Sequence, residues 1–193
     1  KRPDVPDGAS PPTRTTANLM VGRDVPSVTA EPPPKFGDLI LKVDHLTVKN
    51  QDNFPVVKDV SFSIRGGEIF AIAGVSGNGQ VELADAIAGL LKAASGTIVL
   101  NGTDITHYSI RKRTLEGISY IPEDRQNYGL VMDFTLEDNL ALRNYFKEPF
   151  SKKGIPNREA ISAYGTKLIE EYDVRSGQGN NTIVRCMSGG NQQ

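Results

Sequence analysis

The sequence has almost no cysteine, no long apolar run and no excess of charge of one sign. Its 22 Lys and Arg nearly balance 23 Asp and Glu, which gives no electrostatic reason to expect nucleic acid or an anionic membrane surface as the main partner. The single cysteine, Cys186, rules out an internal disulfide and fits a reducing compartment. The longest apolar run, Ile69 to Val75, is much shorter than the roughly 20 residues that span a bilayer. We therefore expect a cytosolic protein that reaches a membrane only through a partner.

Residues 1–37 differ in composition from the rest of the chain. They hold eight of the 12 prolines, with Thr, Ser and Gly and almost no apolar periodicity, a composition typical of a linker. One short apolar stretch, Leu19 to Arg23, is either the docked end of a preceding segment or a chance cluster. The length allows about one ordinary domain and a tail. We predict a linker over residues 1–37 and one globular domain over residues 38–193.

The globular part mixes strand and helix signals. Val60, Phe62 and Ile64 alternate with polar residues, as in a half-buried strand, and Asn101-Gly102 is a hairpin-turn signal. Helices are expected over residues 110–115, 136–143 and 157–172, and the last two begin at capping residues. A further short strand is expected over residues 117–121. The pattern predicts an α/β fold with an antiparallel edge and a mainly helical second half.

A glycine-rich loop follows the most apolar segment. Glu68 to Ala73 predicts a strand buried on both faces of a parallel sheet. The loop Gly74 to Val81, with the sequence GVSGNGQV, comes next, and a helix is expected from about Gly79 to Leu91. Backbone amides and a helix N-terminus hold phosphates in this strand, loop and helix context. The glycine order is not the GxGxxG of dinucleotide-binding folds, so redox chemistry is not supported.

The loop lacks two side chains that a P-loop uses. A lysine normally follows the last glycine, and a Ser or Thr comes next to hold magnesium. Here Gln80 can form a hydrogen bond but has no charge, Val81 cannot ligate a metal, and Glu82 adds a negative charge. We expect no catalytic residue and no metal ligand in this pocket, although its amides can still hold ATP. The alternative is a bare strand-to-helix turn. The candidate nucleotide-binding residues here are Gly74, Ser76, Gly77, Asn78, Gly79, Gln80, Val81 and Glu82.

Three further segments resemble one family. Met187 to Gln193, reading MSGGNQQ, resembles the signature motif of ABC transporter ATPases. Residues 117–130, reading GISYIPEDRQNYGL, are similar to the Q-loop region in the second half of tandem importer ATPases for simple sugars and nucleosides. Met20 to Arg23 resembles the MVGR that closes the first nucleotide-binding domain of those proteins. Residues 149–175 look most like the nucleoside-importing branch, so the resemblance runs from about Leu19 to the last residue.

This resemblance implies a fold and a domain assignment. The fold is a P-loop NTPase of the ABC type, with an antiparallel β edge, a partial parallel core sheet and a helical signature subdomain. Residues 38–193 would be a second nucleotide-binding domain, which is incomplete because it ends at the signature motif. Walker B, the D-loop and the switch histidine follow that motif in the family, and His45 and His107 both precede it. Hydrolysis by this chain alone is therefore not expected.

The resemblance also implies roles for residues outside the glycine loop. Phe54 is the candidate for stacking on adenine, and the alternative is ordinary packing at a strand edge. Glu123 replaces the Q-loop glutamine that senses magnesium and contacts the transmembrane subunit, but a carboxylate cannot donate as an amide does. The signature residues are expected at a helix N-terminus, where they would hold a γ-phosphate. They are Ser188, Gly189, Gly190 and Gln192.

The implied partners follow from head-to-tail pairing of ABC domains. The signature would complete a nucleotide and its magnesium at the P-loop of the first nucleotide-binding domain of the same polypeptide. Further partners would be transmembrane permease subunits and a substrate-binding lipoprotein, with no nucleic acid, at the cytoplasmic face of a bacterial plasma membrane. The leading hypothesis is an importer ATPase for nucleosides or simple sugars. A non-catalytic nucleotide-binding or scaffold domain is the alternative, and a nucleic-acid-associated ABC protein is disfavoured by the neutral charge.

Overall fold

The computed structural model describes residues 35–192, which divide into two compact units. The first, the sheet unit, comprises the chain to Gln80 and Ala93–His107, and the second, the helical unit, comprises Val81–Lys92 and Tyr108 onward. The predicted linker up to residue 34, the MVGR segment and Gln193 lie outside the described residues. The sequence suggested one core, but each unit has its own, because the described strands and helices bury separate sets of apolar side chains.

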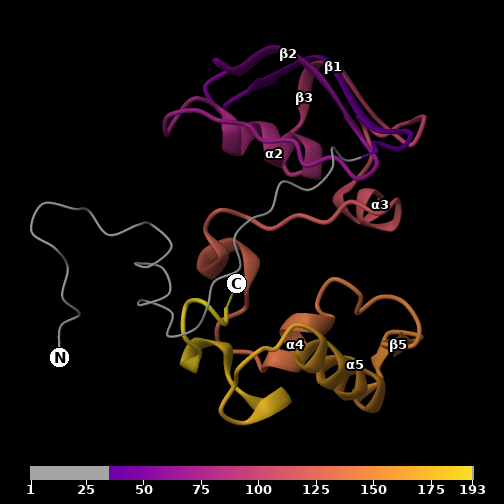
Figure 1. Ribbon diagram of the computed structural model, residues 1–193, viewed down its shortest axis with the longest axis vertical. Coiled ribbons are helices and arrows are strands. Elements are labelled where there is room, and N and C mark those ends of the chain that lie inside the picture. Colours follow the sequence, from indigo (N-terminus) through magenta and orange to yellow (C-terminus); the bar gives the residue numbers. More distant parts are fainter. Residues whose placement is uncertain (1–34, 193) are drawn as a thin grey trace, which may run out of the picture. The chain divides into compact units, whose positions relative to one another are not determined.

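The sheet unit is built on four antiparallel strands (Figure 1). They are β1 (Leu39–Lys49), β2 (Pro55–Arg65), β3 (Ala93–Leu100) and β4 (Thr103–Asp104), in the order β2-β1-β3-β4. The predicted half-buried strand and the hairpin are confirmed. Asn101 and Gly102 have φ values of 48° and 78°, which a two-residue hairpin turn requires. The core consists of side chains no more than 1% exposed: Val43, Leu46, Val48, Ile98 and Ile105.

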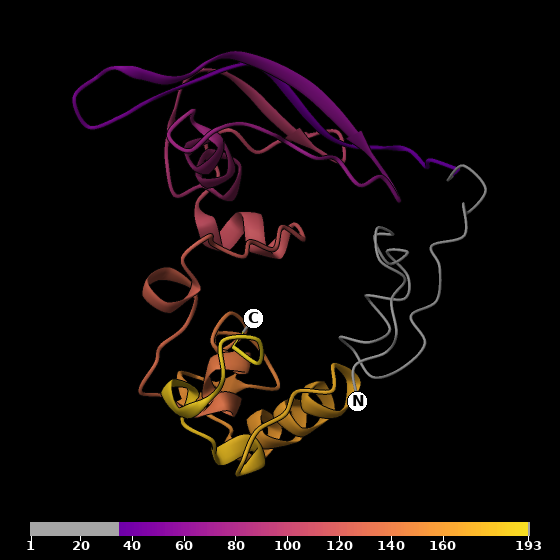
Figure 2. The same ribbon diagram turned by 60° about the vertical axis from the view of Figure 1, so that its left-hand side comes forward.

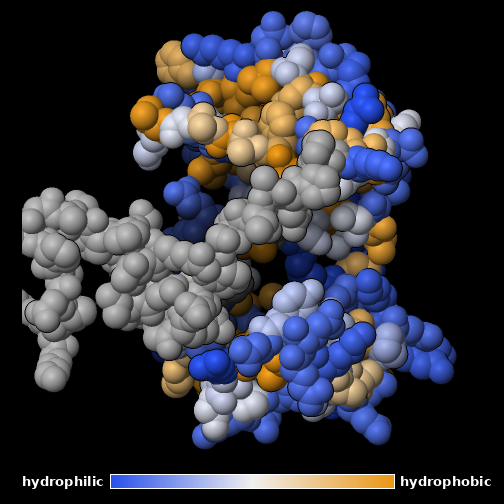
Figure 3. Space-filling view, viewed as in Figure 1, coloured by the Kyte–Doolittle hydropathy of each residue, from blue (hydrophilic) through white to orange (hydrophobic). Residues whose placement is uncertain are grey.

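The expected buried parallel strand over Glu68–Ala73 is wrong for the described structure. This segment has no strand partner among the described residues, and the Ile69 side chain is 97% exposed. Phe70 stacks on Phe62 of β2, with ring centroids 4.9 Å apart. An apolar run is buried on both faces only where strands flank it on both sides, and every paired strand described here is antiparallel. Apolar side chains therefore gather at the surface of the sheet unit (Figure 3).

The helical unit is organised by capped helices. They are α2 (Gln80–Ala88, whose first residue belongs to the sheet unit), α3 (Ile110–Leu115), α4 (Leu136–Ala141) and α5 (Arg158–Glu171). The predicted caps are confirmed: Thr135 accepts from the amide of Asp138, and Asn157 accepts from that of Ala160. A hairpin of β5 (Ser151–Lys152) and β6 (Ile155–Pro156) precedes α5. None of the helices in residues 35–192 has the length and apolar character to traverse a bilayer.

The segment before the C-terminus folds back onto α4. Helices α4 and α5 lie side by side, with the C-terminal segment next to them (Figure 2). The amide of Leu136 donates to the carbonyl of Thr182 at 2.9 Å, and that of Val184 donates to Phe134 at 3.1 Å. Leu136, Val184 and Met187 then form one buried cluster. These contacts fix where the turn after Met187 begins.

The strand expected over residues 117–121 is also absent from the described structure, where Tyr120 is hydrogen-bonded to Asp85 of α2 and to Arg143 and not to a neighbouring strand. Its hydroxyl donates to Asp85 of α2 at 2.7 Å, and its carbonyl accepts from Arg143 at 3.0 Å. Arg143 also donates to Thr114 of α3 at 3.1 Å. Burial, followed by the hydrogen bond to Asp85, raises the pKa of Tyr120 to about 12. The side chains thus join α2, α3 and the segment that leads to Glu123.

Replacing either of two leucines of β1 by alanine should lower the free energy of unfolding by different amounts, because one is in the core of the sheet unit and the other is exposed. Leu46 is 0% exposed and Leu39 is 49% exposed. Leu46→Ala should lower the free energy of unfolding by about 2–5 kcal/mol because it leaves a cavity, while Leu39→Ala should cost less than about 1 kcal/mol. Urea unfolding followed by circular dichroism measures both. Equal costs would contradict the described packing.

The hydrogen bond from Tyr120 to Asp85 predicts how the pKa of Tyr120 changes when Asp85 is replaced. Asp85→Asn should lower the pKa of Tyr120 from about 12 toward, but not to, the ordinary value of about 10, because burial is the larger cause. The folded-state pKa is raised, so the stability from neutral Tyr120 is complete below about pH 10 and is lost as the pH rises through the folded pKa. The Tyr120 ¹³Cζ shift against pH measures this. Asp133→Asn, which removes a partner of Arg185, is the control. An unchanged pKa in Asp85→Asn would exclude the network.

Candidate nucleotide-binding site

Most backbone amides of the glycine loop have no hydrogen bond to any described part of the chain. Gly77 and Gly79 have φ values of 87° and 92°, a left-handed conformation that glycine adopts without steric cost. The amide of Asn78 donates to the carbonyl of Val75 at 3.3 Å. Within residues 35–192, no hydrogen bond engages the amides of Ser76 or Gly79. Helix α2 begins directly afterwards at Gln80. This conformation suits an anion, because free amides stand at the start of a helix.

Two close contacts set the shape of the loop. A Cβ on Gly79 would collide with the carbonyl oxygen of Val56, so the loop lies directly against β2. A Cβ on Gly74 would collide with the amide group of Gln80, so that side chain folds back over the start of the loop. Gln80 thus brings an uncharged amide, in place of an ammonium, to the loop.

Phe54 lies at the start of β2, two residues from Val56. Its backbone is held by Asn50, whose amide donates to the Phe54 carbonyl and whose side chain accepts from the Phe54 amide, both at 2.9 Å. The side chain is 68% exposed. This exposure argues against ordinary packing at a strand edge, and the contact of Gly79 with Val56 brings the loop to the same end of β2.

Glu123 stands exposed at a bend in the helical unit, just before a π-helical turn, η1 (Arg125–Gly129). Asp124 caps that turn, accepting from the amides of Gln126 and Asn127 at 3.1 Å. The hydrogen bond from the Asn127 side chain, followed by that from its backbone, holds the pKa of Asp124 below its usual range. The capped turn fixes the chain around Glu123, whereas the Glu123 carboxylate has no hydrogen bond or ion pair within residues 35–192.

The signature residues form an exposed turn that reaches the last described residue, Gln192, and the helix expected to start there stays a prediction. The carbonyl of Ser188 accepts from the amides of Asn191 and Gln192, each at 3.0 Å, which closes a single helical turn that has no continuation up to residue 192. The Ser188 hydroxyl accepts from the Asn191 side chain at 2.9 Å. No hydrogen bond in the described part of the chain engages the amides of Ser188, Gly189 or Gly190. These three donors are the groups that an anion needs.

Gln192 holds this turn in place with its own side chain. Its amide nitrogen donates to the carbonyls of Val184 and Met187 at 3.0 and 3.2 Å. Its amide oxygen accepts from Gln126 of η1 at 3.0 Å. Gln192 therefore positions the turn, and it also joins the turn to the Glu123 segment.

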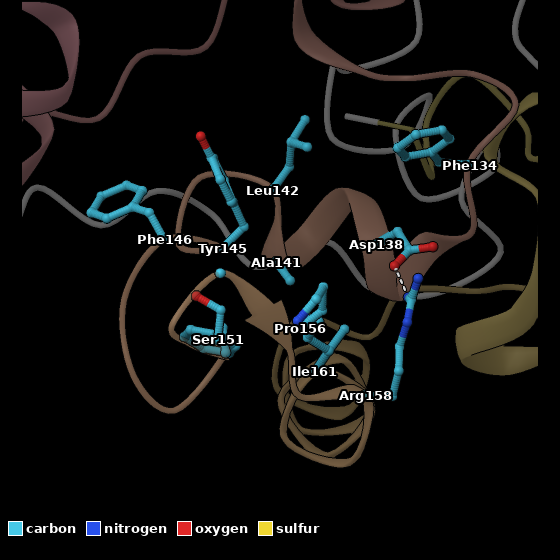
Figure 4. Close-up of a pocket in the computed structure, with 12 residues that line it drawn as sticks. Phe134, Asp138, Ala141, Leu142, Tyr145, Phe146, Ser151, Pro156, Arg158 and Ile161 are labelled. Atoms are coloured by element: carbon cyan, nitrogen blue, oxygen red, sulfur yellow. Dashed lines mark hydrogen bonds and ion pairs between the residues drawn. The ribbon is translucent and has the colours of Figure 1, made fainter.

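Two cavities open in the helical unit. The larger, of about 860 Å³, lies beside Glu123 and is bordered by Tyr120, Tyr128 and Arg143. The smaller, of about 300 Å³, lies between α4, α5 and the β5-β6 hairpin, with the Asp138 and Arg158 ion pair at its edge (Figure 4). It holds none of the residues proposed from the sequence. No group of three or more His, Cys, Asp or Glu side chains in residues 35–192 is placed to hold a metal.

The candidate residues thus form two groups. The loop residues from Gly74 to Gln80 and Phe54 belong to the sheet unit. Val81, Glu82, Glu123, Gln192 and the signature turn belong to the helical unit. Sequence reasoning missed that Arg125 and Gln126 contact the signature turn. Their place directly after Glu123 was visible, but a contact across 66 residues has no local signal.

Comparison with known proteins agrees with this description. The chain is 45% identical over 177 residues to the guanosine import ATP-binding protein NupO of Bacillus subtilis, covering 92% of this chain and 34% of that protein. It is 42% identical to the nucleoside import ATP-binding protein NupA of Lactococcus lactis, over 92% of this chain and 35% of that protein. The ribose import ATP-binding protein RbsA of Lactococcus lactis is 36% identical to this chain, over 90% of this chain and 34% of that protein. The chain thus spans about a third of the length of these relatives.

Solved structures show the same fold. A nucleotide-free ATP-binding cassette from an ABC transporter superposes with a TM-score of 0.63 at 23% identity, over 80% of this chain and 61% of that one. A bacterial Atm1-family ABC exporter with ATP bound superposes with a TM-score of 0.56 at 20% identity, over 92% of this chain and 30% of that one. The predicted α/β fold of the ABC type is therefore confirmed for part of a cassette. The ABC transporter family model matches residues 57–193, a range that includes both the glycine loop and the signature turn, and the chain belongs to this family.

Proposed function

We propose that this chain is the second nucleotide-binding domain of a tandem ABC importer ATPase and that it works mainly by donating its signature turn. The observation that carries the proposal is a pair of loops with amides that have no hydrogen bond within residues 35–192. These amides are those of Ser76 and Gly79 in one loop, and of Ser188, Gly189 and Gly190 in the other. Two sites of this kind suit a head-to-tail pair, in which each nucleotide lies between the loop of one domain and the turn of the other. The partner would be the first nucleotide-binding domain of the same polypeptide.

The chain's own loop is proposed to hold a nucleotide without turning it over. Free amides and the exposed Phe54 ring fit the phosphates and the adenine of ATP. Gln80 supplies no charge, and Val81 has no oxygen for magnesium. Magnesium is therefore assigned to the partner's site. This uncharged loop also supports the second candidate, a non-catalytic nucleotide-binding or scaffold domain.

The transported solute is proposed to be a nucleoside. The support is that relatives named for guanosine and nucleoside import are 45% and 42% identical to this chain, against 36% for a relative named for ribose import. Transmembrane permease subunits and a substrate-binding lipoprotein would complete the importer, with this domain at the cytoplasmic face of the membrane. The cavity of about 860 Å³ beside Glu123 offers a concave surface for a permease segment.

Mixing experiments test the donation of the turn. Magnesium-dependent ATP turnover should be absent for this chain alone and should appear when the separately expressed first domain is added. Ser188→Ala should reduce the gain by about tenfold or more, because the phosphate loses a hydroxyl donor. Ser176→Ala, which removes a hydroxyl bonded to the carbonyl of Gly179, is the matched control. Turnover by the chain alone would refute the proposal that hydrolysis needs the nucleotide-binding loop of the partner domain.

Restoring the missing P-loop groups tests the account of the chain's own loop. The double variant Gln80→Lys with Val81→Ser should bind magnesium-ATP at least about tenfold more tightly, because it adds a cation and a metal ligand. Isothermal titration measures the affinity. Gln178→Lys, which adds the same charge at an exposed position, should leave it unchanged. If the double variant binds magnesium-ATP no more tightly, the missing cation and metal ligand at positions 80 and 81 do not limit binding at this loop.

A further inference from the structure

The guanidinium of Arg125 lies against the signature turn. Its Nη2 atom is 3.1 Å from the position that a Cβ on Gly189 would occupy. Gly189 has no φ in the left-handed region, so its backbone does not need glycine. The one local constraint on residue 189 is therefore steric, because any side chain there meets the Arg125 guanidinium. The close approach places a positive charge beside the unpaired amides of Ser188, Gly189 and Gly190.

Arg125 has no hydrogen bond or ion pair within residues 35–192. Its Nε atom is buried and has no acceptor. Every other arginine of the helical unit, in its described part, has an acceptor or an aromatic ring. These are Arg111 on Phe146, Arg113 on Ala86 and Ile87, Arg143 on Tyr120, Arg158 on Asp138, Arg175 on Asp173 and Arg185 on Asp133. A buried donor without a partner costs free energy, so the described chain leaves this guanidinium uncompensated while its Nη2 end lies beside the turn.

The neighbouring carboxylate does not neutralise Arg125. Both oxygens of Asp124 are used within the capped turn, where they accept from Gln126 and Asn127. No ion pair joins Asp124 to Arg125 within residues 35–192. The guanidinium therefore remains available to an external anion, and its planar set of N–H donors matches a phosphate group.

We propose that Arg125 binds phosphate together with the Ser188–Gly190 turn, as a cationic side chain of this site. The ligand class is the terminal phosphate of a polyphosphate chain. Arg125 would supply the charge that backbone amides lack, and Gln126, bonded to Gln192, would hold the two segments together. The inference rests on the proposed function, since it adds a residue to the same signature site.

A titration of the whole chain with sodium tripolyphosphate tests this, because that probe has no base that could bind at Phe54. NMR spectra of the ¹⁵N-labelled chain at constant ionic strength should show the amides of Gly189 and Gly190 and the Nε–H of Arg125 shifting with one common Kd. Signals of Gly77 and Gly79 report the glycine loop separately. Arg125→Gln should raise the Kd at the turn by about tenfold, the usual effect of losing a charge-assisted hydrogen bond.

A second variant keeps the arginine but moves it. Gly189→Ala adds a Cβ 3.1 Å from Nη2 of Arg125, which displaces the guanidinium by a few tenths of an ångström, so it should weaken binding less than Arg125→Gln does. Two controls match these changes. Arg185→Gln removes the same charge from an ion-paired position three residues before Ser188, and Gly177→Ala adds a methyl group where nothing lies within 4 Å. Both should leave the Kd within about twofold. Unchanged amide signals of α5 in each variant show that the helical unit remains folded.

The outcomes separate the inference from the proposed function. If the Gly189 and Gly190 amides bind tripolyphosphate equally well in Arg125→Gln, the inference is wrong and the donation of the turn stands. The inference is also wrong if Arg185→Gln weakens binding as much as Arg125→Gln, because a general loss of charge then explains the effect. If tripolyphosphate moves none of these signals in the unaltered chain, the inference is wrong, and the mixing experiment alone decides the donation of the turn.

Discussion

A backbone turn can hold an anion only if its amides are left unpaired, so other groups must fix its shape. This constraint governs both loops of the chain. In the glycine loop, the close approach of Gly79 to the Val56 carbonyl fixes the loop against β2. In the signature turn, the Asn191 side chain donates to the Ser188 hydroxyl, and the Gln192 side chain donates to the carbonyl of Val184. Val184 belongs to the buried cluster with Leu136 and Met187, so these bonds fix the turn to that cluster. The amides that face outward are thereby spared.

Charge decides what each loop can do. The glycine loop has an uncharged amide from Gln80 beside it and is followed by the Glu82 carboxylate in the first turn of α2. It therefore lacks the cation that offsets a triphosphate, and the proposed role is to hold a nucleotide. The signature turn has the guanidinium of Arg125 beside it, with no acceptor of its own in the described chain. The charged side chain next to the glycine loop is thus negative, and the one next to the signature turn is positive, which is consistent with a pair of unequal sites.

Local signals in the sequence predicted more of the fold than non-local ones. Thr135, Asn157 and the Asn101-Gly102 turn were predicted because capping and turn chemistry act over three or four residues. The strand over Glu68–Ala73 was not found because a central strand depends on neighbours far along the chain, and the described residues provide none. The residues of both candidate loops were identified from motifs. The contact of Arg125 with Gly189 was missed because only the folded chain brings these positions together.

The central claim is that the signature turn of this chain completes a nucleotide site on a different domain. Sedimentation equilibrium of this chain mixed with the separately expressed first domain, with a non-hydrolysable ATP analogue and magnesium, tests it directly. We expect a one-to-one complex that forms with the analogue, dissociates without it and is weakened by Ser188→Ala. Association that is independent of nucleotide, or pairing of this chain only with itself, would show that the turn does not complete the partner's site.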